Sequence, residues 1–209
     1  MRGVSPASTT STPVAARGRP RHPDTDRAIL QTAFRLLVET GYAGLSIEAV
    51  AAAAGVAKTT LYRRYPTKRD LVIAALENAT SFVTPIEAAD TRAALAAFVR
   101  QAISAMVETG AIRVLGSLLV EDAREPDLLE VFRRRLLDPR RAMFETIIER
   151  GVERGDVRPD VNPLIVTEMI AGAIFGHHAI LGRQSDEAWI QALVDHVWAA
   201  IAAVPAEPR

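Results

Sequence analysis

The stretch SIEAVAAAAGVAKTTLYRRYPTKRD, residues 46–70, decides the fold. Ser46 is a residue type that caps helix N-termini, and the apolar residues after it predict a short helix. Gly55 and Val56 then form a tight turn, and a second short helix follows until Pro66 stops it, because the residue before a proline avoids helical backbone angles. Two short helices joined by a glycine-containing turn are the layout of a helix-turn-helix, whose second helix enters the major groove of DNA.

The sequence on both sides of this motif also predicts helices. A first helix begins near Asp24 and ends at Gly41, where glycine favours the left-handed angles of a helix end. Thr67 and Asp70 form a capping-box pattern at the start of the helix that follows the motif. Further helices are expected at about 90–108, 111–122, 125–154, 161–182 and 185–203. No sustained period-2 alternation is present, so the fold class is all-α.

One of these helices contains the dipeptide Asp138-Pro139. A proline inside a helix removes a hydrogen bond and collides with the preceding turn, so the segment 125–154 should kink or break there. Asp138 is able to cap the second half of the broken segment. Five arginines flank this point and are expected to form a solvated face; they are Arg133, Arg134, Arg135, Arg140 and Arg141.

Composition restricts the class of protein. The chain has 209 residues, of which 49% are hydrophobic, and it contains no cysteine, which excludes disulfides and thiolate sites and fits a reducing, cytoplasmic location. No apolar run opens the chain, so no signal peptide is expected. The most apolar stretch, 161–181, is interrupted by Glu168, His177 and His178, which favours a buried helix over a membrane span.

Charge is distributed unevenly along the neutral chain. Residues 1–80 carry a net charge of +5 and residues 81–209 a net charge of −5, so the N-terminal part is suited to meet a polyanion. Residues 1–22 have a disorder-prone composition and contain the basic run RGRPR, with Arg17, Arg19 and Arg21. This arm either lies in an A·T-rich minor groove, where arginine is attracted, or forms a solubilising tail that touches phosphates loosely.

The second helix of the motif carries the candidate DNA contacts. Leu61 faces the core, which leaves Lys58, Thr59, Tyr62 and Arg63 on the open side, with Thr60 and Arg64 at its margins. Lysine and arginine donate to guanine O6 and N7, and a threonine methyl contacts the thymine methyl. Tyr62 and Thr60 are better suited to phosphate, as are Ser46 and Lys68 beside helix N-termini. The alternative is a basic helix face that is merely solvated.

The run from Gly41 to Leu71, centred on GVAKTTLYRRY, resembles the tetracycline-repressor (TetR) family of bacterial transcriptional regulators. The resemblance covers about 24–76. It implies a three-helix DNA-binding domain, a larger helical ligand-binding domain and a homodimer on a palindromic operator. By position in the motif it implies base contacts from Lys58, Thr59 and Arg63, and phosphate contacts from Ser46, Thr60, Tyr62 and Lys68.

Two positions depart from the family pattern. Ala57 stands where family members often carry serine, so the second helix of the motif loses a capping hydroxyl, at a cost of roughly 1 kcal/mol, together with one potential phosphate contact. Pro66 replaces a commoner lysine or serine-like residue, which puts a contact at that position in doubt.

The expected organisation is a basic arm at 1–22, a helix-turn-helix domain at 23–70, and an effector-binding and dimerisation domain at 71–209. Dimer contact is expected through about 161–203, on small residues of one helix and apolar residues of the next, although core packing is the alternative for both. These residues are Ala171, Gly172, Ala173 and Gly176, then Trp189, Leu193, Val197, Trp198 and Ile201.

Candidate residues for an effector pocket are methionines, aromatic residues and aliphatic residues, which adapt to varied apolar ligands. They are Phe98, Met106, Leu115, Phe132, Phe144, Ile147, Met169 and Phe175, with His177 as a polar member. For each of the apolar residues, ordinary core packing is the alternative. A mostly apolar or amphipathic effector follows from this set.

A metal or catalytic site at His177 and His178 is disfavoured. Consecutive helical residues point about 100° apart, so both do not easily bind one ion. Glu168 is nine residues from His177, and no HExxH-like spacing is present. The chain is therefore expected to have no metal, no cofactor and no enzymatic activity.

The sequence as a whole predicts a cytoplasmic, homodimeric regulator, a repressor rather than an activator, that binds double-stranded operator DNA and is released by a small-molecule effector. Two alternatives remain open. One is a small helical enzyme that uses His177 or His178, and the other is an architectural DNA-binding protein that acts through the arm.

Overall fold

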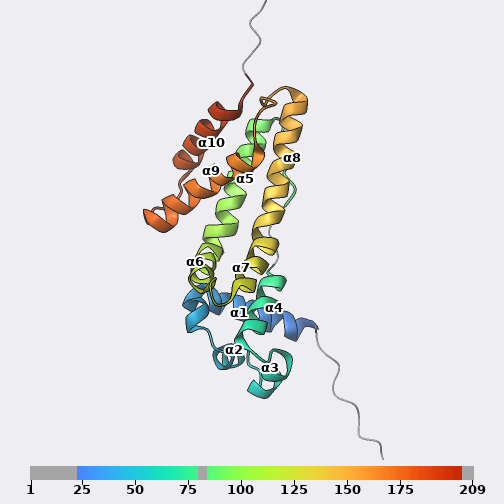
Figure 1. Cartoon of the computed structure of the whole chain (residues 1–209), viewed down its shortest axis with the longest axis vertical. Coiled ribbons are helices and arrows are strands. Elements are labelled where there is room, and N and C mark those ends of the chain that lie inside the picture. Colours follow the sequence, from blue (N-terminus) through green and yellow to red (C-terminus); the bar gives the residue numbers. More distant parts are fainter. Residues whose placement is uncertain (1–22, 80–83, 204–209) are drawn as a thin grey trace, which may run out of the picture.

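The computed structural model describes residues 23–79 and 84–203, and it is an elongated arrangement of helices (Figure 1). The helices α1 to α4 form one end, termed the head, and the helices from α5 onward form the rest, termed the body. The head consists of α1 (Pro23–Gly44), α2 (Ile47–Ala53), α3 (Lys58–Arg64) and α4 (Lys68–Asn78). The body consists of α5 (Thr91–Ile103), η1 (Ser104–Glu108), α6 (Ala111–Glu121), α7 (Pro126–Phe132), η2 (Arg133–Leu137), α8 (Asp138–Arg154), α9 (Pro163–Phe175), η3 (Gly176–Ile180) and α10 (Glu187–Ile201).

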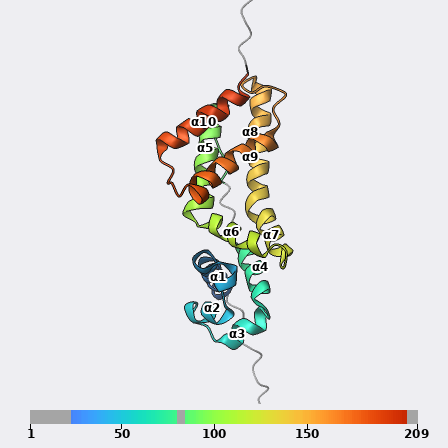
Figure 2. The ribbon, with the colours of Figure 1, turned by 60° about the vertical axis from the view of Figure 1, so that its left-hand side comes forward.

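The prediction of an all-α fold is confirmed. Within residues 23–79 and 84–203 the ordered elements are α-helices and three short π-helical segments, and β pairing is limited to one isolated bridge between Val157 and Ala202. In Figure 2, α6 and α7 lie between the head and the other helices of the body. The order of the helices along the chain, from α1 to α10, agrees with the predicted order.

The predicted helix boundaries of the head follow from local hydrogen bonds. The Ser46 hydroxyl oxygen accepts from the Ala49 N–H at 3.1 Å and caps α2. Thr67 and Asp70 form the predicted capping box, since each side chain accepts from the other residue's backbone N–H at 3.1 Å. Gly41 has φ 68° and interrupts α1 where the sequence placed the end of the first helix.

The prediction that Asp138 caps the second half of the segment 125–154 is wrong. Asp138 is the first residue of α8 and does not cap it, because η2, a π-helical turn, runs directly into α8 without an extended residue between them. Pro139 lies in the first turn of α8, where the N–H that proline lacks is not needed for an intrahelical bond. The π-helical turn thus replaces the expected break.

In the part of the chain that the structure describes, the hydrophobic core consists of two clusters. The first joins the head to α6 and α7, and includes Leu37, Leu61, Leu76 and Phe132. The second lies among α5, α8, α9 and α10, where the rings of Phe98 and Phe144 are 4.8 Å apart. Because the first cluster contains helices of both the head and the body, the head does not pack independently of the body.

Gly110 marks the closest approach between body and head. It lies in the turn between η1 and α6 with φ 77°, a left-handed conformation that glycine adopts at no steric cost. A Cβ atom at this position would come within 2.3 Å of Val38 Cγ1 on α1. Glycine is therefore required here both by the backbone angle and by the neighbouring helix.

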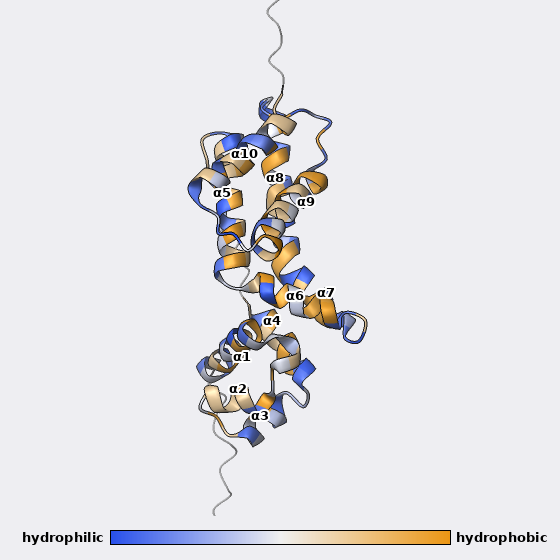
Figure 3. Ribbon diagram, turned by 90° about the vertical axis from the view of Figure 1, so that its left-hand side faces the viewer, coloured by the Kyte–Doolittle hydropathy of each residue, from blue (hydrophilic) through white to orange (hydrophobic). Residues whose placement is uncertain are grey.

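The segment Pro163–Ile180, which covers α9 and η3, is less buried than predicted. It is long and apolar enough to meet a length-and-hydropathy test for a membrane span, and only 22% of it is buried. The expectation of a helix buried within the chain is therefore wrong. Apolar side chains on its outer face, including Ile165 and Met169, are about half exposed. Figure 3 shows hydrophobic residues along α9.

The predicted solvated face of five arginines is also wrong for one member. Arg133, Arg134, Arg135 and Arg141 are exposed, whereas Arg140 is only 6% exposed and lies inside the body. The π-helical turn shifts the register between α7 and α8, so the sequence spacing does not place all five side chains on one face.

Candidate nucleic-acid interface

The turn between α2 and α3 positions the candidate DNA-contacting helix. Gly55 adopts φ 67°, and the Val56 N–H donates to the Ala51 carbonyl at 3.0 Å, which closes the turn. Leu61 on α3 and Val50 on α2 are fully buried in the first core cluster. This packing fixes α3 against the head and leaves its opposite side at the tip of the molecule (Figure 1).

The three predicted base contacts share that outer side of α3. Lys58, Thr59 and Arg63 are all exposed, and they come from successive turns of one short helix. Figure 3 shows hydrophilic residues at this tip. The side chains have the donors and the methyl group that base edges in the major groove require, so base contact by these residues stays a prediction that the geometry allows.

The predicted phosphate contacts lie around the same tip, and some of these side chains already form hydrogen bonds within the chain. Thr60 is half-buried and Ser46 caps α2, although a serine hydroxyl that accepts one hydrogen bond still has a proton to donate. The Tyr62 hydroxyl donates to Glu48 Oε1 at 2.5 Å. Lys68 Nζ donates to the Tyr42 carbonyl at 2.9 Å and lies 4.4 Å from the centre of the Tyr42 ring.

The contact between Tyr62 and Glu48 shifts both pKa values in opposite directions. Donation from the tyrosine hydroxyl lowers the pKa of the Glu48 carboxyl, and the same hydrogen bond raises the pKa of the Tyr62 hydroxyl. Glu48 therefore remains an anion beside the predicted interface. To reach a phosphate, the Tyr62 hydroxyl has to leave this carboxylate.

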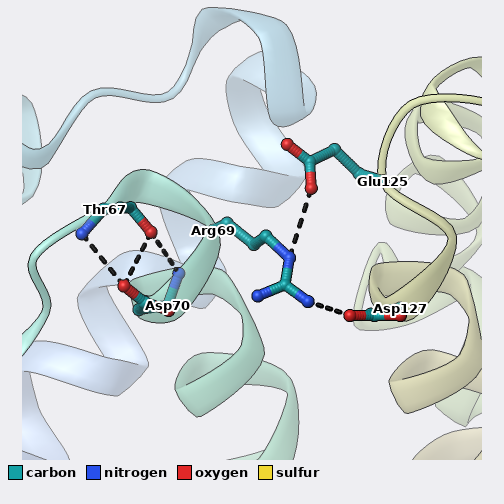
Figure 4. Close-up of polar contacts among 5 residues, drawn as sticks. All are labelled: Thr67, Arg69, Asp70, Glu125 and Asp127. Atoms are coloured by element: carbon teal, nitrogen blue, oxygen red, sulfur yellow. Dashed lines mark hydrogen bonds and ion pairs between the residues drawn. The ribbon is translucent and has the colours of Figure 1, made fainter.

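Three ion pairs formed by two arginines of the head were not predicted from the sequence. Arg64 pairs with Asp26 and joins α3 to α1. Arg69, on α4, pairs with Asp127 and also with Glu125, at 3.2 Å from its Nε, and so joins the head to the start of α7 (Figure 4). Opposite charges far apart in a sequence give no signal of this kind, because the tertiary packing brings them together.

The basic arm lies outside the described residues. Arg17, Arg19 and Arg21 belong to residues 1–22, so minor-groove contact by the arm stays a prediction.

A cavity of about 580 Å³ in the body, termed the body cavity, lies among α5, α6, α8 and α9. Of the residues predicted for an effector pocket, four line it: Phe98, Met106, Leu115 and Phe175. A volume of this size lies within the usual range for small-molecule sites. Its remaining apolar lining comes from Ala102, Ile112, Leu119, Leu137, Leu164, Ile170, Ala171 and Ile174.

The other predicted pocket residues do not line this cavity. Phe132, Phe144 and Ile147 are buried in the core clusters, as the alternative of core packing predicted. Met169 lies on the outer face of α9 and is 49% exposed. The apolar spacing along a helix does not tell a cavity wall from a packed or outward face, so the sequence did not separate these four residues from the lining residues.

His177 and His178 have structural partners. His177 stacks on Trp189, with ring centres 4.1 Å apart, and its Nε2 lies 3.1 Å from the Gln184 carbonyl. His178 Nε2 lies 2.9 Å from Ser185 Oγ. The two rings therefore hold the loop that follows η3, and His177 does not reach the body cavity.

The expected dimer residues divide between the core and the surface. Val197 and Ile201 are buried in the second core cluster, and Trp189, Leu193 and Trp198 pack against it, so these five serve mainly the chain's own packing. Ala171 and Gly172 are exposed on α9. The exposed residues of α10 include four alanines that were not predicted as contacts, Ala188, Ala192, Ala199 and Ala200. The four-residue spacing of Ala188 and Ala192 is the signal for them in the sequence.

Comparisons with known proteins agree with this geometry. The short α2, the glycine turn and the exposed basic helix α3 define a helix-turn-helix protein of the class that regulates transcription. The family profile "Bacterial regulatory proteins, tetR family" matches residues 29–75, and "Tetracyclin repressor-like, C-terminal domain" matches residues 85–197. The chain belongs to the TetR family of transcriptional regulators.

The relatives that it resembles include two transcriptional regulators of other bacteria. The chain is 32% identical over 192 residues to the DNA-binding transcriptional repressor TetR of Mycobacteroides abscessus, covering 88% of this chain and 95% of that protein. It is 30% identical over 171 residues to an uncharacterised HTH-type transcriptional regulator of Mycobacterium tuberculosis, covering 81% and 83%.

Solved structures share the fold at lower identity. A TetR transcriptional regulator from Chloroflexus aurantiacus superimposes with a TM-score of 0.69 at 23% identity, covering 87% of this chain and 98% of that chain. A transcriptional regulator from Saccharomonospora viridis, solved in complex with choline, has a TM-score of 0.69 at 19% identity, covering 88% and 100%.

Proposed function

We propose that the chain is a homodimeric, cytoplasmic repressor that binds a palindromic operator through α3 and is released by a small-molecule effector. The observation that carries this proposal is the joint exposure of Lys58, Thr59 and Arg63 on the outer side of α3. In the proposed function, residues 23–70 bind DNA, whereas residues 71–209 bind the effector and the partner chain. The arm at 1–22 adds salt-dependent affinity.

DNA binding is tested by comparing variants of α3 with a remote arginine. Lys58→Ala and Arg63→Ala should each weaken binding to a specific duplex, by about 1–3 kcal/mol for a base contact, at near-physiological salt. Arg150→Ala, an exposed arginine on α8, is the matched control and should leave the affinity unchanged. Unchanged affinity of Lys58→Ala and Arg63→Ala, with equal binding of the wild type to specific and unrelated A·T-rich DNA, would contradict the proposal and favour an architectural role for the arm.

The outer faces of α9 and α10 support the proposal of a dimer. Ile165 and Met169 are exposed on α9, and Ala188 and Ala192 lie one turn apart on the exposed side of α10. Apolar and small side chains that recur on one exposed face allow the helices of two copies to approach closely, and a DNA-binding dimer requires a two-fold axis. The same exposure favours a partner surface over a membrane contact for the segment Pro163–Ile180, because α8 and α10 cover its inner side.

Sedimentation velocity tests the dimer directly. Ala192→Glu should convert the dimer to a monomer, because it would place a charge against its own copy across the two-fold axis. Ala142→Glu, at an exposed position of α8, is the matched control and should remain dimeric. A wild-type chain that sediments as a monomer at micromolar concentration would refute this part of the proposal.

The body cavity supports the proposal of an effector. Its volume of about 580 Å³ and its apolar lining suit a small organic molecule, as does the ligand-binding role implied by the match of the C-terminal family profile. One structural neighbour was solved with choline, which supports a small-molecule site in a body of this fold. No cofactor or metal is part of this function, and the structural partners of His177 and His178 disfavour the enzyme alternative.

A further inference from the structure

Among the residues that the structure describes, Arg140 is a buried cation without a carboxylate partner. It lies on α8 and is 6% exposed, and its Nη1 donates to the Leu136 carbonyl. Its Nε is buried and has no hydrogen-bond partner within residues 23–79 and 84–203. The ion pairs found in that part of the chain include Arg141 with Asp138, but none involves Arg140.

A buried charge in this position is unfavourable unless a group of opposite charge compensates it. Burial lowers the pKa of the Arg140 guanidinium, but arginine keeps its proton in proteins, so the group stays cationic. An unpaired buried charge costs free energy that a paired, hydrogen-bonded one recovers in part. The folded chain therefore contains a site that an anion would complete.

Arg140 borders two cavities, and their linings differ. The body cavity is mainly apolar, with Phe98, Met106 and Phe175 on its walls, and its charged lining besides Arg140 consists of Arg133, Asp138, Arg141 and Glu168. The second, about 540 Å³ and termed the interdomain cavity, lies between the head and the body and is lined by charged groups that include Arg27 and Arg35. An organic molecule with an apolar part fits the first cavity and leaves its anionic group beside Arg140.

We propose that the effector is an apolar organic carboxylate that lies in the body cavity and pairs its carboxylate with Arg140. This inference rests on the proposed function and specifies the chemical class of its ligand. A carboxylate matches the planar guanidinium with two parallel hydrogen bonds, which a neutral amide or alcohol does not reproduce. The apolar walls supply the remaining affinity.

The position of Arg140 also links the ligand to the head. The interdomain cavity that it borders is walled on the other side by α1 and α4, through residues such as Phe34 and Ala75. A carboxylate beside Arg140 competes with the Leu136 carbonyl for the guanidinium, and Leu136 lines the same interdomain cavity. Effector binding thus weakens the hydrogen bond to Leu136, a residue of the body that faces the head across the interdomain cavity.

The test uses the full-length protein and matched probes. Binding of decanoate, decanamide and decyltrimethylammonium is measured by isothermal titration calorimetry. The wild-type protein should bind decanoate about ten- to a hundredfold more tightly than decanamide, which is the ratio of dissociation constants expected for a hydrogen bond to a charged group. It should bind the cation decyltrimethylammonium more weakly than decanamide. Equal affinity for the carboxylate and the amide would overturn the proposal.

Variants at Arg140 assign the preference to this residue. Arg140→Gln and Arg140→Met should remove the preference for decanoate, whereas Arg135→Gln, which changes an exposed arginine outside the cavity lining, should retain it. Arg140→Met removes an unpaired charge, so it should fold with a melting temperature no lower than that of the wild type. A preference for decanoate that survives both Arg140 variants would overturn the proposal.

Variants on α9 assign the site to the body cavity. Gly172 lines the cavity and Gly176 does not, and a Cβ at either position would meet nothing within 4 Å. Gly172→Phe should fill the cavity and weaken decanoate binding at least tenfold, while Gly176→Phe should bind as the wild type does. Unchanged binding by Gly172→Phe would place the ligand elsewhere and overturn the assignment.

The two levels of the proposal fail separately. The calorimetric preference for decanoate needs no DNA, so a protein that shows it without binding any operator would overturn the proposed function and keep the Arg140 site. A protein that binds its operator through α3 but does not prefer a carboxylate would overturn the Arg140 site and keep the proposed function.

Discussion

Substitution of Gly110 by alanine tests how tightly the body is fitted to the head. Gly110 and Gly155 have nearly the same backbone angles, φ 77° and ψ 9° against φ 78° and ψ 11°. They differ in their surroundings, because an added Cβ at Gly110 would lie 2.3 Å from Val38 Cγ1, whereas at Gly155 it would meet nothing within 4 Å. The pair therefore separates backbone strain from collision.

The expected magnitudes follow from these two terms. Left-handed angles cost an alanine about 1–2 kcal/mol, and this cost applies equally to both variants. At Gly110 the collision adds roughly 1–3 kcal/mol of overpacking, because a β-branched valine has little rotamer freedom in a helix with which to move away. Gly110→Ala should thus be less stable than Gly155→Ala by about 1–3 kcal/mol.

The assay is urea unfolding at one fixed protein concentration, since the proposed dimer would make stability depend on protein concentration. The double variant Gly110→Ala with Val38→Ala should recover most of the difference, because the smaller side chain removes the collision. Equal losses in the two single variants, or no recovery in the double variant, would refute the claim that Gly110 is fixed by the contact with α1.

Three further predictions concern the head and the far end of the body. Ala57→Ser should raise the free energy of unfolding by about 0.5–1 kcal/mol, measured by urea unfolding, because α3 lacks a side-chain cap; no gain would show that the cap is not limiting. Glu48→Gln should tighten DNA binding in fluorescence anisotropy, because it removes an anion beside the interface and loosens Tyr62; weaker binding would contradict this. The Asp156 carboxylate accepts a hydrogen bond from the Thr91 hydroxyl at 2.8 Å, which lowers the pKa of the carboxyl. The stabilisation that this contact gives the folded protein is therefore complete above the unfolded pKa of about 3.9 and is lost as the pH falls through the folded pKa. Asp156→Asn should therefore destabilise the protein at pH 7 and flatten the loss of stability in acid, and an unchanged acid profile would contradict the assignment.

Local signals explain why much of the fold was predictable. The caps at Ser46 and Thr67 and the interruption at Gly41 depend on residues within a few positions of one another, so the sequence contains all the information that they require. The outer side of α3 was also predictable, because helical spacing fixes which residues lie opposite Leu61.

Features that depend on tertiary packing were not predictable in the same way. The contact of Lys68 with Tyr42 and the pairs of Arg69 with α7 join residues far apart in the sequence. Arg140 was assigned to a solvated face because its neighbours are arginines, and the π-helical turn that rotates it inward leaves no simple mark in the sequence. The lining of the body cavity was predicted in part, since apolar spacing does not distinguish cavity walls from packed core.

Selection of binding sites from a randomised duplex pool tests the central claim that α3 determines the DNA sequence bound. The wild-type protein should enrich a palindrome whose half-sites are centred one helical turn, about 34–36 Å, or a multiple of it apart. Arg63→Ala should enrich sites that have lost the base preference at one position of each half-site, while Arg150→Ala should enrich the wild-type site. Enrichment of the same site by Arg63→Ala, Lys58→Ala and Thr59→Ala, or of no palindrome by the wild type, would contradict the account.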